Sequence, residues 1–204
     1  MYNYQVTEIH CVIGQAGSGK STFIKQNFPK DDHIFYNVGS ILRKMFGASI
    51  GKKQKGNKNT WDFADQLVYN IFDHCHHISR THDVPMVSDG FPRNVNQLDY
   101  MDKKLRVVEY GNIELNFHLL DISEEEQLRR ISERNGELTQ YHIDRVSESR
   151  RTFECVVERL ESILLDDTEN LDYKLNWYKQ EDGSFQKVST NINALESKDF
   201  HQYK

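Results

Sequence analysis

Short apolar runs, separated by longer amphipathic stretches, recur along the chain. The runs at 9–13, 33–38, 84–88, 115–120 and 185–188 have the length and the β-branched or aromatic content of strands. Apolar residues at helical spacing fill most of the gaps between them. This alternation predicts an α/β fold of three layers, in which helices flank a five-stranded parallel sheet. Ligands are then expected beyond the carboxyl ends of the strands.

The segment after the fourth run begins with a signal for the start of a helix. Ser123 and Glu126 have the S-x-x-E spacing of a capping box, in which each side chain bonds a free backbone N–H group. A helix through Arg134 is therefore predicted. Because Arg130 and Arg134 are four residues apart, they should share one face of this helix.

Composition narrows the class of protein. With 204 residues, 37% of them apolar and 28% charged, the chain fits a single globular domain over 1–204. No apolar run approaches the roughly 18 residues that span a bilayer, and the polar first residues lack the apolar centre of a signal peptide. We therefore expect a cytoplasmic protein without a membrane partner. Cys11, Cys75 and Cys155 have unrelated spacings that predict neither disulfides nor a zinc site, and Cys11 is expected to be buried.

The net charge of −5 argues against general binding of nucleic acid, but the charge is unevenly placed. Between Asp32 and Asp62 the chain carries six Lys or Arg residues and no acid. This basic stretch is either a surface that receives an anion or a solvated helix face, and charge alone leaves both open.

The turn after the first apolar run carries the most specific motif. Residues 14–21, GQAGSGKS, satisfy G-x-x-x-x-G-K-[ST] between a predicted strand and a predicted helix, as a P-loop does. The glycines let backbone N–H groups face phosphate oxygens, and the helix N-terminus adds partial positive charge. Lys20 is expected on the β- and γ-phosphates of ATP, and the Ser21 hydroxyl on Mg²⁺. The predicted ATP-binding residues are Gly14, Gly17, Ser18, Gly19, Lys20, Ser21 and Thr22.

A second motif follows the third apolar run. That run leads into Asp89, which should lie beside the P-loop and, with Ser21, bind or orient Mg²⁺. The chain continues as Gly90-Phe91-Pro92-Arg93, with Gln97 four residues after the arginine. This sequence resembles the adenylate kinase family of nucleoside monophosphate kinases, whose signature is D-G-[FY]-P-R followed by Gln at that spacing. The resemblance extends from the P-loop to near the C-terminus.

The resemblance implies a binding segment for the acceptor at about 38–70. VGSILR, which ends at Arg43, is similar to the family's T-G-D-x-L-R, and this puts Arg43 on the acceptor phosphate with Arg93 as its partner. Gln97 would hydrogen-bond the acceptor base through its amide. The implied acceptor-binding residues are Val38, Gly39, Arg43, Gly90, Arg93 and Gln97.

The resemblance also implies three arginines on the donor side. Arg130 and Arg134 are similar to the family's pair around the donor nucleotide, of which one stacks on adenine and one contacts phosphate. Arg151 is similar to the arginine that follows seventeen residues later. Guanidinium groups suit phosphoryl transfer because they pair with the charge that spreads over the phosphate oxygens.

A short lid is implied at 135–148, without the zinc-ligand cysteines of long-lid members. Closure of such a lid excludes water that would otherwise accept the phosphoryl group. The lid arginine of the family is replaced by Gln140, and Arg145 or Arg150 remains as a substitute.

Departures from the family pattern bear on the base that is accepted. Val38 stands where the family has Thr, Ser40 where it has Asp, and Asn59 or Thr60 where it has an apolar residue near adenine. The glutamine that reads the base remains, and hydrogen bonds in a pocket discriminate more strongly than apolar contacts, so AMP is the preferred acceptor. UMP, CMP or a deoxynucleoside monophosphate stays as the alternative.

The function predicted from the sequence is that of a monomeric kinase that converts ATP and a nucleoside monophosphate into ADP and a nucleoside diphosphate, with Mg²⁺ as cofactor. Its catalytic residues would be Lys20, Asp89, Arg93, Arg134 and Arg151. A nucleotide-binding protein that has lost turnover is the alternative from a different class.

Overall fold

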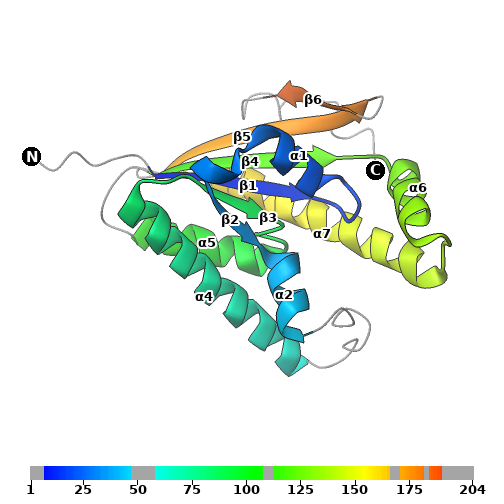
Figure 1. Cartoon of the computed structure of the whole chain (residues 1–204), viewed down its shortest axis with the longest axis horizontal. Coiled ribbons are helices and arrows are strands. Elements are labelled where there is room, and N and C mark those ends of the chain that lie inside the picture. Colours follow the sequence, from blue (N-terminus) through cyan, green and yellow to red (C-terminus); the bar gives the residue numbers. More distant parts are fainter. Residues whose placement is uncertain (1–6, 47–57, 108–112, 166–170, 182–183, 190–204) are drawn as a thin grey trace, which may run out of the picture.

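The computed structural model describes residues 7–46, 58–107, 113–165, 171–181 and 184–189 (Figure 1). The polar loop that follows Gly51 lies largely outside these residues, and the side chains of 58–64 are not described. The expectations for the Asn59 and Thr60 side chains therefore lie outside the described part of the chain.

The centre of the molecule is one sheet whose strands occur in the order β2-β3-β1-β4-β5-β6. Neighbouring strands are parallel from β2 to β5, and β6 pairs with β5 in the antiparallel direction. The strands are β1 (Thr7–Gly14), β2 (Ile34–Asn37), β3 (Met86–Asp89), β4 (Ile113–Asp121), β5 (Leu171–Glu181) and β6 (Ser184–Ser189).

The predicted α/β class is confirmed, but the strand count is six rather than five. The run at 185–188 is an antiparallel edge strand, whereas the fifth parallel strand is β5, which the sequence reading missed. In β5 the apolar residues Tyr173, Leu175 and Trp177 alternate with polar ones, so no continuous apolar run marks the strand. Leu175 and Trp177 are buried on one face, and Asn176 on the other face is buried as well, so a polar residue occupies a buried position that an apolar pattern does not mark.

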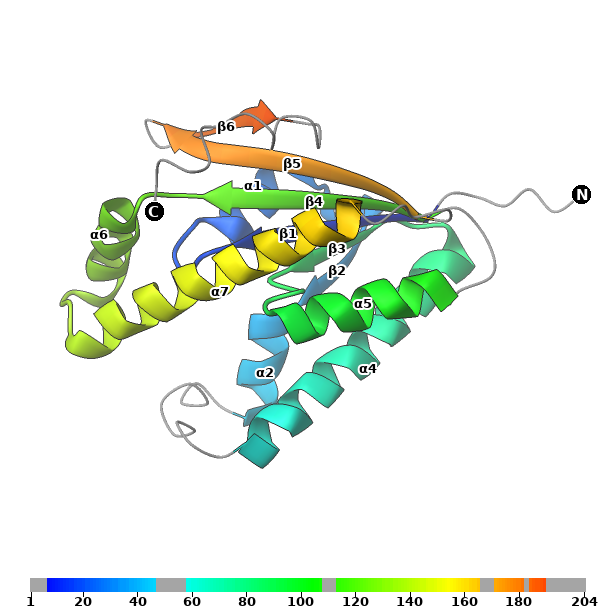
Figure 2. The same cartoon turned by 180° about the vertical axis from the view of Figure 1, so that it is seen from behind.

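Helices cover both faces of the sheet, as Figures 1 and 2 show. Helix α1 lies on one face, whereas α4, α5 and α7 lie on the other. None of the described helices is both long and apolar enough to cross a membrane. The helices are α1 (Lys20–Asn27), α2 (Val38–Phe46), α4 (Lys58–His82), α5 (Val95–Val107), α6 (Glu124–Asn135) and α7 (Gln140–Leu165), with a 3-10 turn at Lys30–Asp32.

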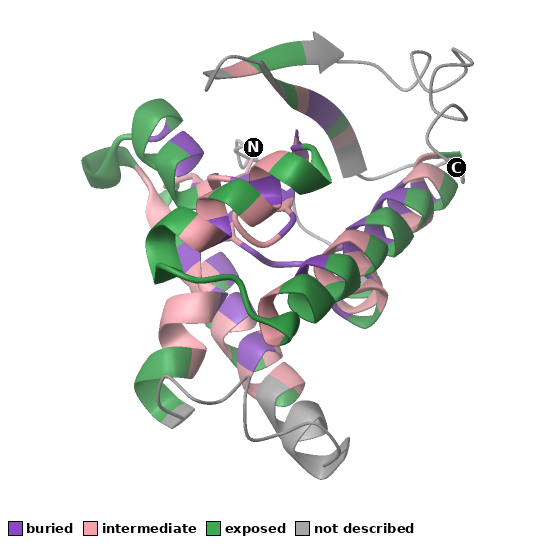
Figure 3. Cartoon of the chain, turned by 90° about the vertical axis from the view of Figure 1, so that its right-hand side faces the viewer, coloured by how far each residue is buried: buried purple, intermediate pink, exposed green. Residues whose placement is uncertain are grey.

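Alternation of side chains along the strands divides the core between the two faces. In β1, Ile9 and Cys11 belong to the larger apolar cluster, whereas Val12 belongs to the smaller cluster with Phe23 of α1. The Cys11 thiol is fully buried, as predicted, and burial raises its pKa. Figure 3 shows the buried positions inside the molecule and exposed residues over the outer sides of the helices.

A chain of polar side chains crosses three strands on the α1 side of the sheet. His10 Nε2 lies 3.1 Å from the Glu8 carboxylate, His10 Nδ1 lies 3.1 Å from His118 Nε2, and His118 Nδ1 lies 3.3 Å from the Tyr178 hydroxyl. Because a carboxylate only accepts, one order of donors satisfies every contact: Tyr178 donates to His118, His118 to His10, and His10 to Glu8. Both histidines are neutral in this arrangement. Burial lowers the pKa of His10 to about 4 and that of His118 to about 3.

Candidate active site

The sheet register brings three strand ends to one level. Val12 of β1 and Asn37 of β2 both pair with Asp89, the last residue of β3. The next residue, Gly90, donates its backbone N–H to the Val12 carbonyl over 3.2 Å. The P-loop after β1 and the D-G-F-P-R segment after β3 therefore start side by side, at the edge where a parallel sheet binds ligands.

The P-loop turns through two glycines with positive φ and ends as the cap of α1. Gly17 and Gly19 have φ of +82° and +87°, values that residues with a Cβ rarely adopt. Thr22, at the exposed start of α1, donates its backbone N–H to the Gly19 carbonyl over 2.9 Å. Ser18 is fully buried within the loop. This local geometry is the one that the glycine pattern predicts.

Lys20 folds back over the loop that precedes it. Its Nζ donates to the carbonyls of Gly14 and Gln15 over 2.9 and 2.8 Å, and lies 3.4 Å from the Ser18 hydroxyl. Burial lowers its pKa to about 8, with Arg93 adding to the shift and Asp89 opposing it. The ammonium group therefore sits in an environment that favours an incoming anion.

One carboxylate oxygen of Asp89 accepts hydrogen bonds from two side chains. Its Oδ2 accepts from the Ser21 hydroxyl over 2.9 Å and from the Asn37 side-chain amide over 2.6 Å. Asn37 also accepts from the backbone N–H of Ser40 over 2.6 Å, so it joins β2, the first turn of α2 and Asp89. The sequence reading missed Asn37, because no motif marks the end of β2.

The donor atoms beside Asp89 fit a magnesium ion. The Ser21 hydroxyl and the Asp89 carboxylate supply oxygens, the ligands that Mg²⁺ prefers, and they lie within one hydrogen bond of each other. Neither side chain is buried, so waters and phosphate oxygens have room to complete the coordination.

Two arginines from different segments approach the same strand ends. Arg43 of α2 turns back so that its Nη1 lies 3.2 Å from where a Cβ on Gly39 would be, and Arg93 Nη2 lies 3.4 Å from the equivalent point on Gly90. Desolvation lowers the pKa of Arg93 although solvent reaches its side chain, and the charges of Arg145 and Arg43 lower it further. The predicted arginine pair is thus brought together beside Asp89.

The amide of Gln97 is already bonded at both ends. Its Oε1 accepts the backbone N–H of Arg93 over 2.8 Å, and its Nε2 donates to Asp65 of α4 over 2.7 Å. Gln97 is only 4% exposed. Val38, another expected acceptor residue, is buried in the larger apolar cluster. Asp65, which no motif indicated, is therefore a partly exposed carboxylate in contact with the Gln97 amide.

Helices α6 and α7 clamp the outer side of the P-loop. The backbone N–H of Ala16 donates to the Ser149 hydroxyl over 2.6 Å, and the Ala16 carbonyl accepts from the Gln127 side chain over 2.6 Å. Gln15 donates to Asp121 at the end of β4 over 3.0 Å. The conformation of the loop therefore depends on contacts that are distant in the sequence.

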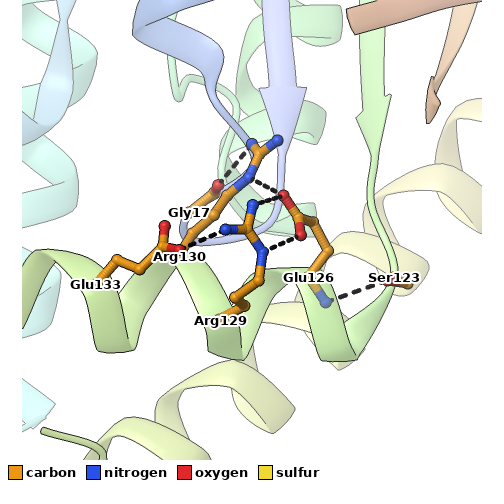
Figure 4. A network of polar contacts seen from close by, with 6 residues as sticks. All are labelled: Gly17, Ser123, Glu126, Arg129, Arg130 and Glu133. Atoms are coloured by element: carbon orange, nitrogen blue, oxygen red, sulfur yellow. Dashed lines mark hydrogen bonds and ion pairs between the residues drawn. The ribbon is translucent and has the colours of Figure 1, made fainter. Parts of the chain in front are cut away.

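Arg130 belongs to an ionic network on α6, shown in Figure 4. Its Nε pairs with Glu126 over 2.7 Å, and its Nη1 lies 3.3 Å from the Gly17 carbonyl. Ser123 caps this helix by accepting from the Glu126 backbone N–H over 3.2 Å, which confirms the predicted helix start. Arg129 also binds Glu126, which leaves that carboxylate shared between two guanidinium groups.

The expected lid is mostly helix. Gly136 ends α6 with φ of +80°, and Thr139 begins α7 by accepting the His142 backbone N–H over 2.9 Å. Arg134 and Arg151 are both exposed. Among the described residues, the structure records no contact between either arginine and Lys20 or Arg93, so it does not bring these two expected catalytic residues into the cluster.

Comparison with known proteins identifies the family. The AAA domain family AAA_17 matches residues 13–147, more than half of the chain. The adenylate kinase of Helicobacter hepaticus (strain ATCC 51449 / 3B1) is 27% identical over 110 residues, which cover 48% of this chain and 54% of that protein. The chain thus spans about half the length of this relative.

Solved structures of two assemblies also resemble the chain. One is described as the structure of the Pnkp1/Rnl/Hen1 RNA repair complex; its matched chain is 17% identical, with a TM-score of 0.49 over 74% of this chain and 48% of that one. The other, of the Pnkp1/Rnl/Hen1 complex, is 19% identical, with a TM-score of 0.47 over 69% of this chain and 43% of that one. On the family match and the P-loop geometry, the chain belongs to the AAA domain family AAA_17, as an adenylate kinase-like P-loop kinase domain.

Proposed function

We propose that this chain is a nucleoside monophosphate kinase that reversibly transfers the γ-phosphoryl group of ATP to a nucleoside monophosphate, with AMP preferred. The observation that carries the proposal is the meeting of Lys20, Arg43 and Arg93 around Asp89. These three cations outnumber Asp89 and Asp65, the two carboxylates that act on them, and phosphate groups on both substrates would neutralise the net positive charge at the strand ends. We propose one kinase domain over 1–204, with an acceptor segment at 38–70 and a lid at 135–148.

The donor side rests on the P-loop. Its backbone N–H groups, the N-terminus of α1 and Lys20 would bind the β- and γ-phosphates of ATP. Ser21 and Asp89 would hold Mg²⁺, which when bound neutralises charge on the phosphate oxygens. Lys20 would exchange the two loop carbonyls that it now contacts for phosphate oxygens.

The acceptor side favours a phosphate over a hydroxyl group. Arg43 and Arg93 together can bind a phosphate dianion, whereas a neutral hydroxyl would leave both guanidinium groups unmatched. An oxygen of the acceptor phosphate would attack the γ-phosphorus as the bond to the β–γ bridging oxygen breaks, and ADP would leave with that electron pair. With both substrates fully ionised, no proton has to move.

The acceptor base would be read beside Gln97 and Asp65. Each end of the Gln97 amide retains one further hydrogen-bonding capacity, because an amide nitrogen carries two donors and its oxygen two lone pairs. Adenine presents a matching donor and acceptor at N6 and N1. The Asp65 carboxylate accepts only, so it would pair with a donor on the base, such as the exocyclic amino group of adenine.

An ADP-release assay with ATP·Mg²⁺ and each ribo- and deoxynucleoside monophosphate tests the proposal. We expect the fastest turnover with AMP. Lys20→Met should abolish turnover and leave the fold intact by circular dichroism, whereas Lys25→Met, at an exposed lysine on the same helix, should retain activity. ATP binding without turnover on every acceptor, or a Lys20→Met variant of undiminished rate, would refute the proposal.

A further inference from the structure

Helix α7 is fixed to the P-loop in its third turn. The Ser149 hydroxyl lies 2.6 Å from the Ala16 backbone nitrogen, so this face of the helix packs on the loop that would carry the donor phosphates. Arg145 lies one turn earlier, and residues four apart share a helix face. Four residues advance about 6 Å along the axis, a distance that an arginine side chain can span. Arg145 is therefore placed to reach over the open side of the loop.

Arg145 acts electrostatically on two cations that come from different parts of the fold. Its positive charge lowers the pKa of Lys20 after β1 and that of Arg93 after β3, where it is the largest cause after desolvation. Lys20 belongs to the proposed donor site and Arg93 to the proposed acceptor site. A group whose charge acts on both residues lies near the boundary between the two sites. The phosphoryl group crosses this boundary during transfer.

Two other positions of this region are bonded to protein partners. Arg150 donates to the Ile122 carbonyl over 2.9 Å, so its guanidinium is used to join α7 to the end of β4. Gln140, where the family resemblance leads one to expect an arginine, is bonded to Asp144 over 2.9 Å. Arg145 is exposed, and within the described part of the chain it forms no hydrogen bond or ion pair.

Electrostatics indicate what Arg145 would bind. Lys20, Arg93 and Arg145 repel one another, and they are offset by Asp89, which acts on the first two, and by Asp65, which acts on Arg93. Such a cluster lowers its energy by taking up an anion between its members. In phosphoryl transfer the charge on the equatorial oxygens of the moving group is the part that planar guanidinium groups stabilise.

We propose that Arg145 is a catalytic arginine that contacts the γ-phosphoryl group during its transfer, supplied from the start of α7 rather than from position 140. This inference rests on the proposed kinase function and deepens it. As the bond from the γ-phosphorus to ADP breaks and the bond to the acceptor oxygen forms, Arg145 pairs with the non-bridging oxygens and exchanges no proton.

The test compares Arg145→Ala, Arg145→Lys and a charge control, Lys103→Ala, at an exposed lysine of α5. We expect kcat of Arg145→Ala to fall on the order of a hundredfold, the loss seen when one donor to a transition state is removed. Arg145→Lys should restore part of the rate, since it keeps the charge without the planar fork. The control should keep the wild-type rate, and all variants should keep the melting temperature because both side chains are exposed.

Two further measurements separate contact in the transition state from a structural effect. Added guanidinium ion should raise the rate of Arg145→Ala and leave that of the control unchanged. Binding of ADP with aluminium fluoride and AMP, which mimics the transferred group, should weaken by a similar factor in Arg145→Ala, while ATP affinity changes only a few fold.

The outcomes distinguish a failure of the Arg145 assignment from a failure of the proposed kinase function. Wild-type protein without turnover on any nucleoside monophosphate would overturn the proposed function. Wild-type turnover with an Arg145→Ala variant of nearly unchanged kcat would overturn the role of Arg145 alone. A loss of rate that comes with equal losses of ATP affinity and analogue affinity would also overturn it. Arg145 would then bind the substrate as strongly as the transition state and would not stabilise the transition state selectively.

Discussion

Acid pH should destabilise the fold through the buried histidine chain. His118 is 8% exposed, donates to His10 and accepts from Tyr178, and burial lowers its pKa to about 3. The unfolded chain binds a proton at this site near pH 6.5, whereas the folded chain resists protonation until much lower pH. A group whose folded pKa is depressed contributes stability above its unfolded pKa and loses it as pH falls. The affected window therefore begins near pH 6.5 and extends towards pH 3.

The magnitude follows from the two pKa values. Between about pH 7.5 and about pH 5.5, linkage from pKa about 3 in the folded state and 6.5 in the unfolded state lowers the free energy of unfolding by about 1.4 kcal/mol for His118 alone. His10, with a folded pKa of about 4, adds a similar loss, which the neighbouring positive charge of His33 increases and Glu114 reduces. Carboxylates contribute their own slope, so the histidine share has to be isolated by substitution.

Urea denaturation of the wild type and of His118→Gln across this pH range isolates that share. A glutamine amide can still donate to His10 but does not titrate. We expect the variant to lose about 1.4 kcal/mol less than the wild type on acidification, because at about pH 5.5 it takes up about one proton fewer on unfolding. Parallel pH dependences in the two proteins would refute the buried, neutral state of His118.

Three further predictions concern single side chains. Gly19→Ala should lower the free energy of unfolding by about 1–2 kcal/mol in urea denaturation, since φ is +87° and the new methyl group would lie 3.2 Å from Arg130 and 3.4 Å from Phe185. The value of kcat/KM for ATP should fall about tenfold per pH unit above about pH 8, as Lys20 in the free enzyme loses its proton; a flat profile to pH 9.5 would contradict this. Tyr36→Phe should cost about 1 kcal/mol by the same denaturation assay, because the buried hydroxyl donates to a carbonyl of α4 over 2.5 Å.

The parts of the site encoded by contiguous residues could be predicted from the sequence. The P-loop and the D-G-F-P-R segment carry their own backbone requirements, and the carboxyl ends of parallel β1 and β3 lie near each other because their register pairs Val12 with Asp89. The helix start at Ser123 was likewise a local signal that the structure confirms, although the Glu126 carboxylate binds Arg129 and Arg130 instead of completing the capping box.

The parts formed by tertiary pairing could not be predicted. Asn37 reaches Asp89 only because β2 adds to the outer side of β3, and Ser149 reaches Ala16 only because α7 packs across the loop. Neither residue belongs to a motif. Strand β5 was missed for a different reason, since one face of it is polar and its alternation is weaker than a continuous apolar run.

The Gln97 amide shows how packing changes an expected role. The sequence suggested a side chain free to read a base, whereas the structure turns it inward onto Arg93 and Asp65. A carboxylate on α4 thereby becomes part of the proposed acceptor site. No spacing rule connects residues that are 32 positions apart and belong to two different helices.

The most direct test of the central claim follows the labelled γ-phosphoryl group of ATP in the presence of AMP, or of adenosine and a 5′-hydroxyl oligonucleotide in its place. Our account predicts labelled ADP from AMP and no labelled product from either hydroxyl acceptor, because Arg43 and Arg93 require a phosphate to neutralise them. Label on a hydroxyl acceptor, with none on AMP, would contradict the assignment of this site to nucleoside monophosphates.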